Sequence, residues 1–234
     1  YIDTGYTEWG ASGLAAVWAE NNTRESIYEA FRRKETFATS GSRIKVRFFG
    51  GYNLEKILEE GDPIKYAYAN ASSMGSDILQ NQNQVPEFMV WAIRDLKRAP
   101  LDRVQIIKGW TELSGKPHEK VYDVACSDGR KANIKTGLCK DSRAKVNLSN
   151  CKISKNFGAD ELKVVWKDPD FNPNLKAFYY VRVLENPTCR WSTWDAIKSG
   201  EKPRGDLPST IQERAWTSPI WYVPDLSLIH ISEP

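Results

Sequence analysis

Hydrophobic and polar positions alternate with a period of two along most of the chain after residue 42. The clearest run is 43–49, where Ile44, Val46 and Phe48 alternate with charged residues before Gly50 and Gly51. The same alternation predicts further strands at 87–93, 103–108, 120–125, 161–166, 177–184 and 215–222. Turn-forming runs rich in Pro, Gly, Asp and Asn separate these segments. Short strands spaced in this way predict a mainly β fold, an antiparallel β-sandwich over residues 43–225.

The first 42 residues show a different pattern. Residues 13–19 form an almost unbroken apolar run, which is typical of a strand buried on both faces of a parallel sheet. Asn22 stands three residues before Glu25, the spacing of a helix N-cap with a reciprocal carboxylate. A strand, a helix and a second strand therefore predict a βαβ unit over 1–42, and one such unit cannot bury its own faces. The chain also opens on Tyr1 with neither an initiator Met nor a signal-peptide pattern, so we expect a fragment of a longer protein.

The cysteines lie late in the chain. Cys126, Cys139 and Cys151 fall in a segment at about 126–156 that lacks hydrophobic patterning, and Cys189 lies further on. A disulfide, free buried thiols and a zinc site are the alternatives, but the long spacings and the lack of a C-x-x-C pair disfavour zinc. We expect Cys126 to bridge Cys139 or Cys151. A disulfide would indicate an exported protein, periplasmic or extracellular.

Composition excludes several classes of function. Lys and Arg number 33 and Asp and Glu 30, a net charge of +3, which is too balanced for a protein that grips nucleic acid. No apolar run approaches the ~20 residues of a membrane span. The two histidines, His118 and His230, cannot form a His-rich metal site or a His-based triad. Residues 226–234, which include His230, resemble the translation of a transposase-type sequencing adaptor, so we treat them as a non-native tail.

Two clusters are candidates for chemistry, each with a structural alternative. Asp168 and Asp170 offer two carboxylates for a cation or for acid–base work, or they mark a turn fixed by Pro169. Arg190, Trp191 and Trp194 offer a ligand-stacking surface, or they pack near a strand end.

Several long strings, in order, resemble one family. They are GLAAVWAENNTRE (13–25), RKETFATSG (33–41), RIKVRFFGG (43–51), LDRVQIIKGW (101–110), WKDPDF (166–171), FYYVRVLE (178–185) and QERAWTSPIWY (212–222). From residue 10 to residue 224 the chain resembles the C-terminal portion of the DUF3604 family of bacterial proteins. The resemblance implies an upstream barrel domain of the polymerase-and-histidinol-phosphatase (PHP) type, related to the CehA/McbA hydrolases. Its His-x-His and Asp-x-His motifs would bind a divalent metal, and segment 1–42 would be its closing remnant. The family often has Pro at the position of Cys189, so we do not expect a disulfide there.

The resemblance favours a non-catalytic part of a metal-dependent hydrolase whose metal ligands lie upstream, with no cofactor in this chain. In barrels of this kind ligands gather at the C-terminal ends of strands. Glu20 and Arg24 follow the first expected strand and are therefore the candidates for a pocket rim. Their alternative is mutual pairing or helix capping. The alternative function is a sandwich that binds a carbohydrate or another polymer through its aromatic residues.

Overall fold

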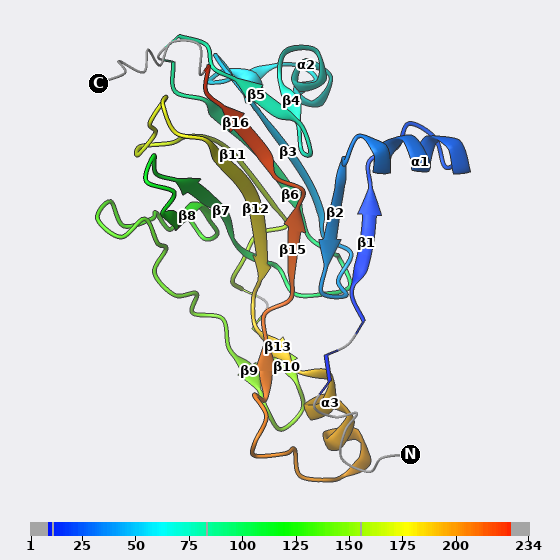
Figure 1. Cartoon of the computed structure of the whole chain (residues 1–234). Coiled ribbons are helices and arrows are strands. Elements are labelled where there is room, and N and C mark those ends of the chain that lie inside the picture. The colour runs from blue at the N-terminus through cyan, green and yellow to red at the C-terminus, as the bar shows by residue number, and fades with distance from the viewer. Residues whose placement is uncertain (1–8, 11, 83, 155, 226–234) are drawn as a thin grey trace.

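The computed structural model describes residues 9, 10, 12–82, 84–154 and 156–225, and it is mainly β with antiparallel sheets (Figure 1). The larger sheet has eight strands in the order β1-β2-β15-β12-β16-β5, and β7 pairs with both β12 and β8. Its strands are β1 (Leu14–Val17), β2 (Thr36–Thr39), β5 (Asp77–Leu79), β7 (Leu101–Thr111), β8 (Pro117–Cys126), β12 (Ala177–Glu185), β15 (Arg214–Thr217) and β16 (Ile220–Val223). Only the β16–β5 pair in this sheet is parallel.

A second sheet packs against the first across a shared core. It has the order β11-β6-β3-β4, with bounds β3 (Lys45–Gly51), β4 (Ser72–Ser73), β6 (Glu87–Ile93) and β11 (Glu161–Lys167). Phe48 and Phe88 of this sheet lie in one buried cluster with Ile106, Tyr179 and Val181 of the larger sheet. The ring centroids of Phe88 and Tyr179 lie 4.3 Å apart. The two sheets therefore face each other as the alternation predicts.

Helices and short ribbons surround these sheets. The helices are α1 (Arg24–Arg32), α2 (Pro63–Asn70), α3 (Trp191–Ser199) and a single 3-10 turn, η2 (Ile57–Glu59); the ribbons are β9 (Val146–Asn147) with β10 (Lys152–Ile153), and β13 (Thr188–Cys189) with β14 (Thr210–Ile211). None of the helices among the described residues has the length and apolar character of a membrane span. The expected non-native tail at 226–234 lies outside the described residues.

The predicted strands are confirmed with one exception. The segment 87–93 matches β6 at both ends, and the others differ from their strands by a few residues. The segment 215–222 is instead two strands, β15 and β16, separated by Ser218 and Pro219. The Ser218 amide donates to the Thr36 carbonyl, and Pro219 has no amide to donate. As a result β15 lies beside β2, while β16 lies beside β5.

The prediction for the first segment is wrong in two respects. β1 pairs antiparallel with β2, and its residues are exposed or half-buried rather than covered on both faces. The chain returns directly after α1, where the Trp18 amide donates to the Glu35 carbonyl. The helix therefore stands at the end of the strand pair and does not cross a sheet face (Figure 1). Thr23, not Asn22, is the N-cap, and its hydroxyl accepts from the Ser26 amide at 3.2 Å. β2 also pairs with β15, so this segment continues the larger sheet.

All four cysteines form disulfides. The expected bridge between Cys126 and Cys139 is confirmed, and it closes the start of the insertion. The expectation against Cys189 is wrong, because Cys189 bonds to Cys151 across 38 residues. That bridge joins the insertion that carries β9 and β10 to β13 beside α3. Two disulfides indicate maturation in an oxidising environment.

We predict that replacing Cys151 and Cys189 together by Ser lowers the free energy of unfolding by about 2–4 kcal/mol, because the unfolded chain gains the freedom of a long loop. Urea unfolding followed by tryptophan fluorescence measures the change. Thiol labelling of the unreduced, denatured wild-type chain serves as the control and should detect no free thiol. Two labelled thiols would contradict the pairing.

Glu185 is a buried carboxylic acid in the larger sheet. Its side chain is 0% exposed, and neither carboxyl oxygen has a hydrogen-bond partner among the described residues. Burial raises the pKa of Glu185 to about 7, and the charges of the nearby Glu213 and Asp95 also raise it. The folded protein therefore favours the neutral acid. The raised pKa of Glu185 stabilises the fold fully below pH ~4.5, and this stabilisation is lost as the pH rises through about 7.

The variant Glu185→Gln should accordingly be more stable than the wild type at pH 8, by about 1–3 kcal/mol, and close to it at pH 4.5. Urea titrations of both proteins at the two pH values measure this difference. A difference that is the same at both pH values would show that Glu185 does not change its protonation on folding.

Candidate functional site

Aromatic side chains form a row on the outer face of the larger sheet. Along β12, Tyr179 points into the core, so its neighbours Phe178 and Tyr180 point outward. Phe178 lies opposite Trp221 of β16 on one side and opposite Gly109 of β7 on the other. Gly109 in turn lies opposite Glu119 of β8. The row of paired positions therefore crosses four neighbouring strands and carries aromatic side chains on two of them, β16 and β12.

Gly109 leaves the space that the Phe178 ring occupies. A Cβ atom added there would lie 2.2 Å from the Phe178 ring, so any other residue would displace the ring. The Phe178 and Trp221 rings lie 5.1 Å apart at 54°, and the Phe178 and Tyr180 rings are stacked at 6.4 Å. The three rings form one apolar surface, and Trp221 is 38% exposed at its edge.

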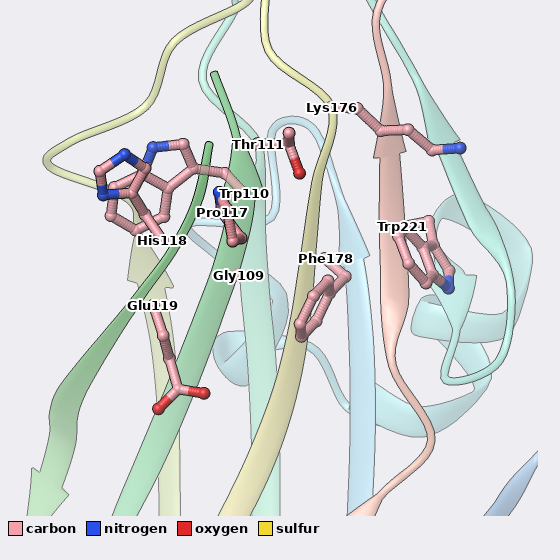
Figure 2. Close-up of a pocket in the computed structure, with 9 residues that line it drawn as sticks. All are labelled: Gly109, Trp110, Thr111, Pro117, His118, Glu119, Lys176, Phe178 and Trp221. Carbon is pink, nitrogen blue, oxygen red and sulfur yellow. The ribbon is translucent and has the colours of Figure 1, made fainter. Parts of the chain in front are cut away.

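Polar groups flank the rings. The surface borders a hollow of about 490 Å³, which Thr111, Pro117, Glu119 and Lys176 also line (Figure 2). The Lys176 ammonium lies 5.4 Å from the centre of the Trp221 ring. Burial raises the pKa of Tyr180, and the charge of Glu119 raises it further. Carboxylate, hydroxyl and ammonium groups thus surround an aromatic surface, an arrangement that fits a ligand with apolar faces and several hydroxyl groups.

His118, the single histidine outside the tail, also lines this hollow, as does Trp110 (Figure 2). Its ring stacks on Trp110 at 5.1 Å, and its Nε2 lies 2.7 Å from a carboxylate oxygen of Glu112. No group of three His, Cys, Asp or Glu side chains in the described ranges could hold a metal ion.

Asp168 and Asp170 have structural partners. Asp168 is buried, and its carboxylate accepts from the Lys108 ammonium at 2.6 Å and the Tyr179 hydroxyl at 2.7 Å. Asp170 accepts from Tyr122 and Lys120, whose hydrogen bonds lower its pKa. The turn fixed by Pro169 is thus the better description, because protein groups already occupy both carboxylates.

Glu20 and Arg24 do not meet. Glu20 lines a second hollow of about 490 Å³, together with Trp18, Ala19, Arg33, Glu35, Arg47 and Tyr68. Arg24 instead borders an apolar surface on α1, with Glu25, Ile27, Tyr28 and Phe31. Only Glu20 therefore faces a polar hollow. The role of each as a pocket-rim residue stays a prediction.

Arg190 and Trp191 bind another segment of the chain. Both donate to the carbonyl oxygen of Trp9, at 2.9 and 3.0 Å. Trp194 lies further along α3, 43% exposed, with the Lys198 ammonium 4.9 Å from its ring centre. A ligand-stacking role for the three residues stays a prediction.

Sequence reasoning missed the outer aromatic row. Alternation along 177–184 places Phe178 and Tyr180 on one face, which was the available signal. Trp221 and Gly109 join them only through pairing with distant strands, and local pattern does not show that pairing.

A family model described as "Protein of unknown function (DUF3604)" matches residues 2–224. The comparison with curated proteins found no match, and neither did the comparison with solved structures.

Proposed function

The chain belongs to the DUF3604 family, whose function is unknown, and from its geometry we propose that it is a β-sandwich whose outer face binds carbohydrate. The observation that supports this proposal is the row formed by Trp221, Phe178 and Gly109 across neighbouring strands. The C–H faces of a sugar ring are apolar and pack on aromatic rings, while sugar hydroxyls need polar partners. Glu119 accepts hydrogen bonds, Lys176 donates them, and Thr111 does both.

The site suits an extended chain of sugars better than a single one. Its rings lie on a sheet surface, not in an enclosed cavity, and a surface of this kind contacts several sugar units in succession. Each contact contributes little, so affinity depends on their number. Secretion to the periplasm or the cell exterior, where such polymers lie, agrees with the two disulfides.

We predict that at least one of three hexasaccharides (cellohexaose, xylohexaose or chitohexaose) binds the 234-residue chain. Trp221→Ala should weaken this binding about 5- to 30-fold, since one stacked ring contributes about 1–2 kcal/mol. Isothermal titration measures the affinity. Because Trp221 lies at the surface edge, the variant should fold normally.

The matched control is Trp194→Ala, which removes an equally exposed indole from α3. It should bind as the wild type does. Failure of all three hexasaccharides to bind would contradict the proposal. An equal loss in the Trp194 variant would move the site to the surface formed by Arg190, Trp191 and Trp194.

A second proposal concerns the intact protein. We propose that it is a metal-dependent hydrolase, whose PHP-like barrel lies upstream of this chain. The order of the strings shared with the DUF3604 family supports this proposal. Under this proposal the present chain is a non-catalytic part, with Glu20 and Arg24 at most near the rim.

The full-length protein from the same gene should hydrolyse bis-p-nitrophenyl phosphate after loading with Mn²⁺ or Zn²⁺, and should lose this activity with EDTA. The 234-residue chain should be inactive under the same conditions. Metal-dependent hydrolysis by the short chain would contradict the assignment of catalysis to upstream residues.

A further inference from the structure

The polar hollow beside Glu20 lies where the two sheets meet. Trp18 follows β1 of the larger sheet, and its indole Nε1 donates to the Val46 carbonyl of the second sheet at 2.8 Å. Arg47, the next residue of β3, lies over the Trp18 ring at 3.5 Å. The ring centre of Tyr68 of α2 lies 5.5 Å from the guanidinium carbon, and the Tyr68 hydroxyl accepts a hydrogen bond from Arg47. Arg47 is thus held by two aromatic side chains.

Of the two arginines that line the hollow, Arg33 forms an ion pair and Arg47 forms none among the described residues. Glu35 is 3% exposed, and its carboxylate accepts from Arg33 at 3.4 Å and from the Tyr68 hydroxyl. Burial and this bond to Glu35 raise the pKa of Tyr68 to about 12, while Arg47 lowers it. Arg33 and Glu35 therefore compensate each other. Arg47 donates only to the neutral Tyr68 hydroxyl, and no ion pair joins it to a carboxylate in the part of the chain that the structure describes.

We propose that this hollow binds an oxyanion, a carboxylate or a phosphate group, through Arg47. Stacking on Trp18 fixes the plane of the guanidinium, so its remaining N–H groups donate along its edge in a fixed fork. That fork matches the two oxygens of a carboxylate or phosphate. Because the side chain is already ordered, binding costs little conformational entropy. Glu20 is exposed on the rim, where solvent screens its charge.

The site is independent of the outer aromatic row, because the two share no lining residue. The volume of about 490 Å³ admits a single sugar or a molecule of similar size. Three probes with the same ring therefore separate the alternatives: glucuronate carries a carboxylate, glucose 6-phosphate carries a phosphate, and glucose carries no charge.

Isothermal titration of the 234-residue chain at constant ionic strength tests the proposal. We expect glucuronate, glucose 6-phosphate or both to bind at least ~10-fold more tightly than glucose, and the probe that binds identifies the oxyanion. Arg47→Gln should lower this affinity at least ~10-fold. The control Arg32→Gln removes an exposed cation of α1 that makes a loose contact with Glu29 at 3.9 Å, and this variant should bind normally. Trp221→Ala should also bind normally.

Binding of neither anion, equal binding of glucose, or an equal loss in the Arg32 variant would overturn the proposal. If Arg47→Gln does not fold, the indole ¹⁵N–H signal of Trp18 in the unaltered chain tests whether the anion binds in this hollow. This signal should shift and saturate with the bound anion and stay in place with glucose. An unmoved Trp18 signal at saturating anion would place binding elsewhere.

Discussion

The position of Tyr179 in the core constrains both faces of the larger sheet. Its ring packs on Phe88 of the second sheet, and its hydroxyl donates to Asp168, which also binds Lys108. Loss of either Lys108 or Asp168 would leave the charge of the other buried without its ion-pair partner, which costs about 3–5 kcal/mol. β12 therefore cannot slip by one residue. Because side chains alternate, this register places Phe178 and Tyr180 on the outer face, opposite Gly109 and beside Trp221. The proposed ligand surface thus depends on contacts behind it.

The two proposed sites use aromatic rings in different ways. On the outer face, Phe178 and Trp221 present ring surfaces that a ligand would contact directly. At the junction of the sheets, Trp18 instead covers one face of Arg47 and orients its charge. The first arrangement suits hydroxyl-rich ligands with apolar faces, and the second suits an oxyanion. Together they are consistent with a ligand-binding region, and the upstream hydrolase proposal depends on neither.

Features that depend on local alternation, above all the positions of strands, could be predicted from the sequence. The sequence located β6 and most of β12 because each has a buried face. It also predicted that Cys126 bridges Cys139 or Cys151, and the structure selects Cys139, only 13 residues away. The predictions failed for features that depend on which distant segments pair or pack together. The apolar run at 13–19 looked fully buried, but it forms a half-exposed antiparallel strand. Glu20 and Arg24 are near in sequence yet face different surfaces, since α1 begins between them. Trp221 approaches Phe178 only through the pairing of β16 with β12.

Mapping of the bound hexasaccharide by ¹⁵N NMR tests the carbohydrate-binding face most directly. The account predicts that the Trp221 indole signal and the amide signals of Gly109, Phe178 and Glu119 shift together, with one dissociation constant. The indole signals of Trp18 and Trp194 should stay in place. Shifts confined to Trp194 and its neighbours on α3, or to Trp18, would contradict the assignment of the outer face as the carbohydrate site.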